Sequence, residues 1–599
     1  MQLKFKGIFL GKHWTGPRIP KGIAGIQVNF CKNPLCLNYG RPASSEAQPR
    51  GSAIVGSKRD TYTVNSEPSG KVVLRCDLCG EKLPIKSNLA IHEEYCRLAA
   101  YLTPRQGATC SDEACRNHQI DISTPKAYHF FGWTTAGARR YRCRACGKTV
   151  SVSDNPISRQ RLSNKNEEVF KLLVNKVPLK RMSELASVTM GTLYRKIDFI
   201  HRQCLAFAAA NESRLPDLPI RRLYLSVDRQ EHIINWVHAD DKRNIILNAL
   251  GTADNKSGYI FGVHVNYAPD IDAACVEREA MLIGDNDIHP PFRKYARVWL
   301  AQDYRNSLAK NRKRSVKNLL SDDIRAGYDM VQGREDVEDS DVQTGETILP
   351  YTGMQVHSEY TLYAHFRFLH DLFRNVEKTR FFMDQESGIR AACLSAFWQE
   401  VLEKRCDAFF VHIKSDLTIN QKRKLVADAQ REMDKLRESD PSFADLSDYD
   451  LRLIVIKERL RELAEIGKWH DRWLFYPFPD MSEPLKAICW LTDLHDQAYD
   501  DEHLALLYSK ATLHGVDRFF MQARRRLSLL ERPISSANNE GRKWYGYSPY
   551  NPAMVGKILE ILRVFYNYIE IGEDKKTPAM RLGLTCKPIL IHMVLHPVK

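Results

Sequence analysis

Two strand-like apolar runs in the middle of the chain each end on an aspartate. Residues 223–228 read Leu-Tyr-Leu-Ser-Val-Asp, and residues 381–384 read Phe-Phe-Met-Asp. Open α/β sheets place ligands beyond the carboxyl ends of buried strands, often just before a helix. The pattern therefore marks Asp228 and Asp384 as candidate ligands of one metal site.

The pattern around these runs predicts an ordered succession of strands and helices. Residues 244–250 and 259–265 predict two more strands, so three consecutive strands with short connections form an antiparallel meander. An amphipathic helix over residues 360–376 precedes the second aspartate, and a helix over 391–404 and a strand over 407–413 follow it. This order is that of a ribonuclease-H-like fold, in which the first and fourth strands lie side by side.

A third carboxylate is expected from the last helix of such a fold. The candidate is Glu540 in the run Asn-Asn-Glu-Gly-Arg, ahead of the helical residues 554–568 and behind the plausible caps Ser535 and Ser536. Other acidic residues compete for the three positions: Asp254, Glu386 and Asp303, and in the place of Glu540 also Glu502 and Glu531. Asp303 is the strongest rival, because the apolar residues before it also look like a strand.

Eight of the 15 cysteines form a repeated pattern. Each unit opens with Cys-x4-Cys-x-Asn and closes with Arg-Cys-x2-Cys-Gly. The first unit contains Cys31, Cys36, Cys76 and Cys79, and the second contains Cys110, Cys115, Cys143 and Cys146. Four thiolates in a tetrahedron form a closed structural Zn²⁺ site, so the repeat predicts two zinc ribbons.

The first unit has a second interpretation. Cys76 and Cys79, together with His92 and Cys96 further along, also fit the spacing of a single zinc finger. That arrangement would leave the two earlier cysteines of the unit without partners, so the ribbon is preferred.

Three short helices are predicted between residues 166 and 200. The second and third have the spacing of a helix-turn-helix, in which the later helix contacts DNA. Tyr194, Arg195 and Lys196 are expected on the exposed face of that later helix. The sequence therefore predicts a DNA-binding domain between the cysteine units and the strands.

The composition favours a polyanionic partner. The chain of 599 residues has a formal net charge of +15 and a pI near 9.0, and 43% of its residues are apolar. These values indicate a globular protein of several domains, and the charge favours nucleic acid. No secretory signal is recognisable and no apolar stretch approaches the ~20 residues of a membrane helix, so a cytoplasmic location and no membrane partner are expected.

At these residues the chain resembles the DDE-type transposases of insertion sequences. The resemblance comprises the cysteine units and helix-turn-helix ahead of the core, the aspartate that closes the first strand, the Phe-Met-Asp384 run before a helix, and Asn-Asn-Glu540-x-Arg542. The long stretches between the core segments are unmatched. No single motif is specific, but their joint order is.

The resemblance implies a multidomain α/β protein. Its ribonuclease-H-like core, a mixed five-stranded sheet with helices, would be interrupted by insertions and preceded by two zinc ribbons and a helix-turn-helix. The expected parts are a first zinc-ribbon module (residues 1–100), a second (101–160), the helix-turn-helix domain (161–210), the core in three pieces (220–267, 359–414 and 533–599), an insertion (268–358) and a mostly helical insertion (415–532).

The resemblance also implies an activity. Asp228, Asp384 and Glu540 would hold two Mg²⁺ or Mn²⁺ ions about 4 Å apart, with Asp228 bridging them. Water would cut double-stranded DNA at the transposon ends, and the freed 3′-OH would then attack target DNA. Arg542 and Lys543 would contact the DNA, and a bacterial, DNA-associated homo-oligomer is expected. A catalytically inactive regulator of DNA and a nuclease or resolvase that cuts without joining are the alternatives.

Overall fold

The computed structural model describes most of the chain. The described residues are 17–46, 60–66, 72–103, 108–135, 137–152, 156–157, 160–235, 240–308, 343, 345, 347–386, 388–414, 417–467, 470–493, 499–531 and 548–596. The chain divides into two compact units. Unit 1 comprises Met1–Leu98, Leu215–Arg525 and Leu529–Leu559, and unit 2 comprises Ala99–Arg214, Arg526–Ser528 and Glu560–Lys599.

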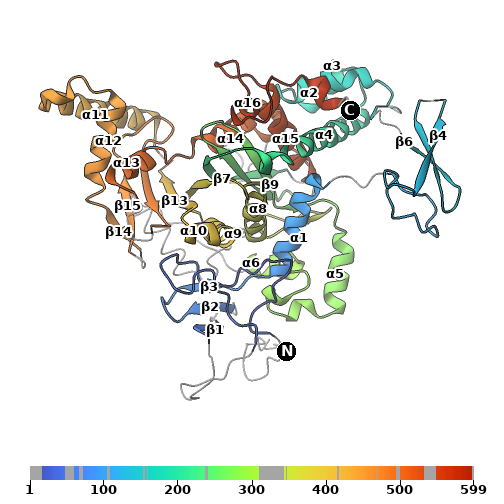
Figure 1. Ribbon diagram of the computed structural model, residues 1–599, viewed down its shortest axis with the longest axis horizontal. Helices are drawn as coiled ribbons and strands as arrows, with labels where there is room; N and C mark the ends of the chain where they lie inside the picture. The colour runs from blue at the N-terminus through green and yellow to red at the C-terminus, as the bar shows by residue number, and fades with distance from the viewer. Residues whose placement is uncertain are drawn as a thin grey trace. The chain divides into compact units, whose positions relative to one another are not determined.

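An eight-stranded mixed sheet is the centre of unit 1 (Figure 1). Its order is β14–β15–β16–β13–β12–β7–β8–β9. The strands are β7 (Arg222–Ile234), β8 (Ile245–Asp254), β9 (Ile260–Val265), β12 (Lys378–Asp384), β13 (Cys406–Ile413), β14 (Ala464–Ile466), β15 (Asp471–Phe475) and β16 (Lys486–Trp490). Strand β12 runs parallel to both its neighbours, β7 and β13, and every other neighbouring pair is antiparallel. The predicted meander of three strands is therefore confirmed.

The sheet is wider than expected, with eight strands instead of five. The additional strands β14–β16 come from the segment 415–532, which was predicted to be mostly helical. Each is only three to five residues long. So short an apolar run has no readable period, and these strands form because β13 offers them an open edge.

The first aspartate strand is also longer than predicted. Strand β7 does not end at Asp228 but continues to Ile234, because β8 pairs with it along its whole second half. Asp228 therefore lies in mid-strand, directly opposite Gly251.

Helices cover both faces of the sheet. The Thr252 side chain reaches His365 of α8 (Ser358–Leu372), with Oγ1 and Nε2 2.7 Å apart. A side chain on the neighbouring residue Gly251 would instead meet Val516 and Phe520 of α14 (His514–Arg526). Successive residues of a strand point to opposite faces, so α8 and α14 lie on opposite sides.

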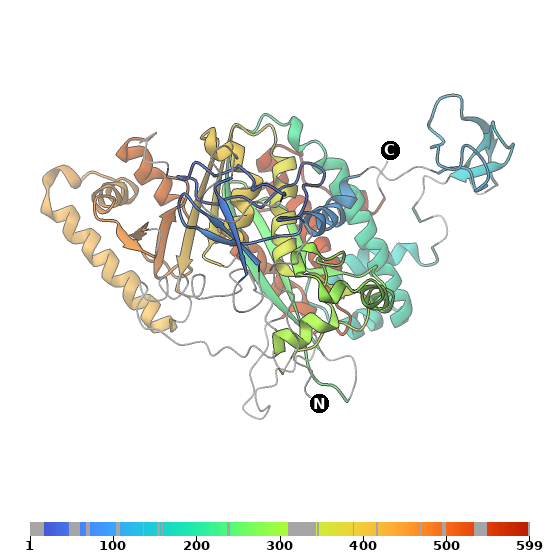
Figure 2. The same ribbon diagram turned by 90° about the horizontal axis from the view of Figure 1, so that it is seen from below.

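The remaining helices of unit 1 pack around this sheet. α9 (Ile389–Ala396) and α10 (Trp398–Leu402) replace the single helix predicted over residues 391–404, with a break at Phe397. α11 (Ile419–Ser439), α12 (Asp448–Arg459) and α13 (Asp501–Ser509) share an apolar core with β12, β13, β15 and β16. Figure 2 shows α11 on the outer side of this edge. Unit 1 also contains β10 (Tyr267–Ala268), β11 (Met354–Gln355), α5 (Ala273–Leu282), α6 (Ala301–Leu308) and the start of α15 (Ala553–Val564).

The first cysteine module, residues 17–46 and 60–87, is built into unit 1. Its sheet consists of β1 (Tyr62–Ser66), β2 (Val72–Cys76) and β3 (Lys82–Pro84). The Tyr39 hydroxyl donates to the Leu394 carbonyl oxygen at 3.0 Å, and Lys86 pairs with Glu359. The module is thus fastened to the helices that cover the main sheet.

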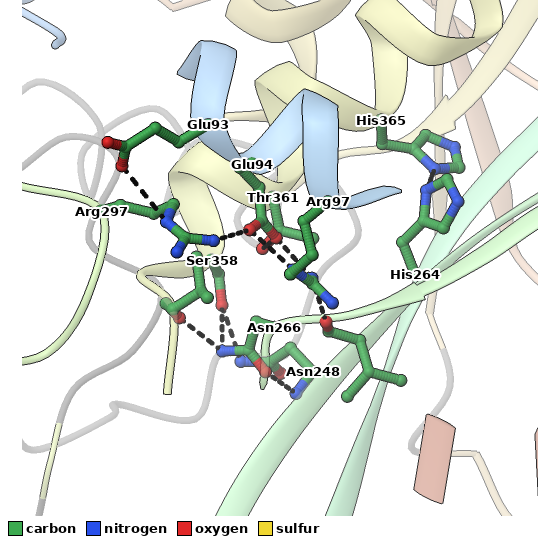
Figure 3. Close-up of polar contacts among 12 residues, drawn as sticks. Glu93, Glu94, Arg97, Asn248, His264, Asn266, Arg297, Ser358, Thr361 and His365 are labelled. Atoms are coloured by element: carbon green, nitrogen blue, oxygen red, sulfur yellow. Dashed lines mark hydrogen bonds and ion pairs between the residues drawn. The ribbon is translucent and has the colours of Figure 1, made fainter. Parts of the chain in front are cut away.

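Helix α1 (Asn88–Ala99) continues this attachment (Figure 3). Its fully buried Glu94 accepts from the Arg97 guanidinium at 2.9 Å and the Thr361 hydroxyl at 3.0 Å, and pairs with Arg297 at 3.1 Å. Because two cations and a hydroxyl surround the carboxylate, they hold the pKa of Glu94 below its usual value although burial opposes this. A buried charge that is paired this fully fixes α1 against α8 and β9.

Unit 2 contains the second cysteine module, residues 108–152, and a group of helices. The module's sheet consists of β4 (Tyr128–Trp133), β5 (Arg139–Cys143) and β6 (Thr149–Val152). The helices are α2 (Asn166–Leu173), α3 (Leu179–Leu185), α4 (Met190–Glu212), α16 (Pro578–Leu582) and α17 (Ile591–Leu595). Inside this group the buried Arg563 pairs with both Glu212 and Glu560.

Candidate functional site

Two of the predicted carboxylates lie on adjacent parallel strands. Met383 of β12 pairs with Val227 of β7, so Asp384 follows in register with Asp228. Neighbouring strands are ~4.8 Å apart, and residues in register point to the same face. Both side chains keep partial access to solvent. The structure thus brings Asp228 and Asp384 together on the face covered by α14.

A third acidic residue joins them from α14. The Asp517 carboxyl group, in the first turn of this helix, interacts directly with that of Asp228. Two glycines let the helix approach so closely. A Cβ on Gly251 would lie 2.9 Å from Phe520, and one on Gly515 would lie 2.9 Å from the Ser226 hydroxyl. Asp517 was not among the predicted site residues.

The local charges repel one another. Burial raises the pKa of Asp384 to about 7, and the charges of Glu386 and Asp517 add to the rise. Burial also raises the pKa of Asp228 well above its usual range, with Asp384 as the next contributor. Like carboxylates this close cannot all ionise without a compensating charge. The Arg229 guanidinium supplies part of it through an ion pair with Glu386 at 2.9 Å.

The donor set suits a hard divalent cation. Carboxylate oxygens are the ligands that Mg²⁺ and Mn²⁺ prefer, and a dication would relieve the repulsion. The arrangement is more open than a finished metal cage, however. In the described part of the chain, three or more ligand atoms come within 4.8 Å of one another only in the two cysteine groups. Asp228, Asp384 and Asp517 therefore form an acidic cluster on this face of the sheet, with oxygen donors of the kind that Mg²⁺ and Mn²⁺ prefer.

The remaining predicted residues of this site either lie elsewhere in the structure or fall outside the described residues. Glu540, Arg542 and Lys543 lie outside the described residues. Asp254 is the last residue of β8, and its carboxylate accepts from the backbone N–H of Ser257 in the following turn at 2.8 Å. Asp303 lies on α6 and pairs with Arg293 at 2.8 Å, so the strand expected ahead of it was wrong.

Glu502, another rival, is 84% exposed on α13.

The eight predicted cysteines form two groups that could hold zinc. In each group the four Sγ atoms all lie within 4.8 Å of one another. In the first module Cys31 lies 3.5 Å from Cys79 and Cys36 lies 3.6 Å from Cys76. The second module repeats this pairing with Cys110 3.3 Å from Cys146 and Cys115 3.7 Å from Cys143. These S–S separations are far longer than a disulfide and match thiolates placed around one ion.

The same supporting contacts surround both groups. The Asn38 side-chain amide donates to Cys76 Sγ at 3.2 Å, and the Asn117 amide donates to Cys143 Sγ at 3.3 Å. Such donors favour the thiolate, and with the backbone N–H groups of Cys146 and Ala145 they lower the pKa of Cys143 to about 6 although burial opposes this. The Asn of each Cys-x4-Cys-x-Asn motif is therefore part of the site.

A tyrosine completes the repeated arrangement. Tyr62 accepts from the Cys31 N–H, and Tyr128 accepts from the Cys110 N–H, each at 2.9 Å. Both tyrosines then donate to the carbonyl oxygen of the motif asparagine. The two modules thus share one architecture, down to their hydrogen bonds.

The alternative finger does not form. His92 and Cys96 lie on α1, where Cys96 is exposed and its Sγ is 3.7 Å from the His92 ring. The ligand atoms that gather around Cys76 and Cys79 are instead those of Cys31 and Cys36.

The predicted DNA-binding helix is part of α4. Tyr194 is 42% exposed and Arg195 is also exposed. Lys196 was expected beside them, but it is buried. Its ammonium group donates to Asn166 Oδ1 at 2.8 Å and to the Leu162 carbonyl oxygen at 2.6 Å. Lys196 therefore joins α4 to α2, and the exposed position expected for it was wrong.

No protein-family model matches the chain, and neither does any curated protein. No helix in the described ranges combines the length and the apolar character needed to cross a membrane.

Proposed function

We propose that this protein is a DNA transposase of the insertion-sequence type, a DNA-cutting and DNA-joining enzyme that uses divalent metal. The observation that carries the proposal is the meeting of Asp228 and Asp384 on adjacent parallel strands, with Asp517 against them. Acidic residues that raise one another's pKa are typical of catalytic sites.

The sheet supports a ribonuclease-H-like core. Five of its strands follow the order β9–β8–β7–β12–β13, a meander of three followed by two strands parallel to the first. In chain order this is 3-2-1-4-5, the arrangement inferred from the sequence pattern. In such a core the third acidic residue belongs to the last helix, and here α14 would supply it with Asp517. Strands β14–β16 would be an addition to the core at the β13 edge.

Three residues of this chain would hold the metal. These are Asp228, Asp384 and Asp517, because Asp228 interacts with Asp517 and the charge of Asp384 raises the pKa of Asp228. Glu540 remains a candidate from the resemblance. Bound there, Mg²⁺ or Mn²⁺ would activate a water and stabilise charge on the phosphate. No covalent intermediate with the protein is needed, so no nucleophilic side chain is proposed.

DNA recognition is assigned to the N-terminal half of the chain. Two zinc ribbons and a helix-turn-helix formed by α3 and α4 would bind the ends of the element, with Tyr194 and Arg195 exposed for contact. Arg542 and Lys543 are carried over from the resemblance as further contacts. The net charge of +15 supports a DNA partner.

A strand-transfer assay tests the proposal. The protein is incubated with Mg²⁺ and labelled DNA that carries the sequences flanking its coding region. Losing a metal ligand removes several kcal/mol of transition-state stabilisation, which is at least about a hundredfold in rate. Asp384→Asn should therefore abolish the joined products while DNA binding persists. The matched variant Asp303→Asn, which changes a carboxylate outside the acidic cluster, should keep these joined products.

The outcomes separate the alternatives. Cutting without joining would assign a nuclease or resolvase. Binding of the flanking DNA without either reaction would assign a regulator. Unchanged products from Asp384→Asn would remove the assigned site.

A further inference from the structure

The hairpin of the second cysteine module exposes an unusual number of aromatic rings. Phe130, Phe131 and Trp133 of β4 are 51%, 45% and 61% exposed. Large rings gathered on one exposed strand mark a binding surface rather than ordinary surface composition. We call the hairpin formed by β4 and β5 the aromatic hairpin.

A bulge places two of these rings on one face. The pairing of β4 with β5 shifts between Phe130 and Trp133, where Gly132 has φ +90°. Three residues apart on a regular strand, the two side chains would face opposite sides. Here the ring centroids of Phe130 and Trp133 are 5.8 Å apart, and Tyr141 is 6.0 Å from Phe130. The bulge thus assembles an aromatic platform.

The other face combines an aromatic ring with cations. The guanidinium groups of Arg140 and Arg142 lie 5.5 Å and 5.4 Å from the centre of the Phe131 ring. His129 lies edge-on at 6.2 Å. Arginines held over a ring by cation–π attraction present flat, charged surfaces beside the exposed platform.

The charge of the module points to an anionic ligand. Residues 108–152 contain seven lysines and arginines against three acidic residues. The last of the three acidic residues is Asp121, so β4, β5 and β6 carry no carboxylate. A partner with π-faces and negative charge matches this composition.

The first module shows that holding the cysteines does not require these rings. In both modules a tyrosine pairs with a cysteine across the hairpin, Tyr62 with Cys76 in the first and Tyr128 with Cys143 in the second. Two residues further along, the second module pairs Phe130 with Tyr141, whereas the first pairs Val64 with Leu74. Leu74 is 1% exposed, in the module's own core. The two modules share their cysteine, asparagine and tyrosine contacts, so the exposed rings are an addition made only in the second.

We propose that the aromatic hairpin binds unpaired bases of DNA by stacking. Bases would stack on the Phe130 and Trp133 rings, while the positive charge of the hairpin's arginines attracts the phosphates. Aromatic side chains in a basic setting bind single strands in this way, since every base offers a π-face. In a duplex those faces are covered, so the hairpin would act where strands are opened. The inference rests on the proposed function in taking DNA as the nucleic acid.

A binding experiment on the full-length, zinc-loaded protein tests this. The Asp384→Asn background prevents cleavage, and fluorescence anisotropy follows a labelled oligothymidylate of about 20 nucleotides, longer than the ~4–16 nucleotides of one stacking groove. Stacking on one ring corresponds to a roughly fivefold to hundredfold change in affinity. Trp133→Leu keeps an apolar side chain without a π-face and should weaken binding by at least about fivefold. Trp133→Phe should bind nearly as well as the parent.

Controls keep the outcome specific. Leu282→Ala removes an apolar side chain on α5 that is 81% exposed and should leave binding unchanged. Retention of two zinc ions per chain would show that each variant is folded. Equal binding by Trp133→Leu and the parent would overturn the proposal. Equal losses in Trp133→Leu and Trp133→Phe would also overturn it, because an aromatic π-face would then fail to restore binding. So would a loss for duplex DNA as large as for the single strand, because the base faces are covered in a duplex.

The two proposals can fail separately. Loss of strand transfer with stacking retained would leave a single-strand-binding protein without transposase chemistry. Joined products from a protein whose Trp133→Leu variant binds the single strand normally would remove only the hairpin proposal.

Discussion

Replacing Asp384 with asparagine should stabilise the folded protein at neutral and alkaline pH. Burial and neighbouring acidic groups raise the pKa of this carboxyl from 3.8 to about 7. Between these pH values the folded protein holds a proton that the unfolded chain has lost. Protonated Asp384 therefore makes its full contribution to the stability of the folded protein below about pH 4, and this contribution is lost as the pH rises through 7.

The size of the effect follows from the shift. The pKa of Asp384 is higher in the folded protein by about three, and each unit corresponds to ~1.4 kcal/mol of free energy. The ionised carboxylate therefore lowers the free energy of unfolding at alkaline pH by up to about 4 kcal/mol. The Asp384 carboxylate accepts a hydrogen bond from the Gln385 backbone N–H at 2.9 Å. An asparagine side chain cannot ionise, but its oxygen can still accept this hydrogen bond. Asp384→Asn should thus raise the unfolding temperature by several degrees at pH 8 and by progressively less toward pH 5.

Thermal unfolding of both proteins across this pH range provides the measurement. Asp303→Asn is the control, because its carboxylate is paired with Arg293 at 2.8 Å and its neutralisation should destabilise the protein at all these pH values. Equal or lower stability of Asp384→Asn at pH 8 would refute the repulsion between the acidic groups, and with it the physical basis of the site.

Three further predictions concern packing and metal. Gly515→Ala should cost about 1–3 kcal/mol and lower activity, because the new Cβ would lie 2.9 Å from the Ser226 hydroxyl, whereas Gly556→Ala has open space and should be neutral or stabilising in a thermal melt; equal effects would contradict the close approach of α14. Cys143→Ser should reduce the zinc content measured by elemental analysis from two ions per chain to one, and a value of two would exclude this cluster as a zinc site. Arg563→Leu should destabilise unit 2 by about 3–5 kcal/mol in denaturant unfolding because it leaves a carboxylate buried without its partner, and adding Glu212→Gln should recover part of that loss; no recovery would show that the ion pair is not the cause.

The sequence was most informative where spacing alone defines the chemistry. Eight cysteines in a repeated pattern predicted two four-thiol groups, and the structure gathers exactly these residues, because a short knuckle can close only on a partner of matching geometry. The competing use of His92 failed for a physical reason. α1 is held by its buried Glu94, and Cys96 on this helix is exposed and lies beside His92 instead of joining the other cysteines.

The acidic site was predictable in part. Asp228 and Asp384 each end an apolar run within a strand, and their meeting needs only a parallel pairing of those two strands. Asp517 could not be found from local sequence. An aspartate in the first turn of a helix is common, because it complements the helix dipole. What turns it toward Asp228 is the close contact allowed by Gly251 and Gly515, which are 264 residues apart in sequence.

Edge strands were the least predictable part of the fold. β14 is three residues long, and β15 and β16 are five each, too short to show a period of two above chance. Their formation depends on the open edge of β13, a tertiary feature. The burial of Lys196 also could not be predicted from local sequence, because it depends on hydrogen-bond acceptors at Leu162 and Asn166.

Crystals of the protein soaked in Mn²⁺ would test the central claim most directly, because the anomalous signal of manganese places the ion without reference to any assay. We expect a peak about 2.1 Å from carboxylate oxygens of both Asp228 and Asp384, close to Asp517, and no such peak in Asp384→Asn. An acidic cluster that stays empty at saturating Mn²⁺, or a peak that persists unchanged in Asp384→Asn, would contradict this assignment.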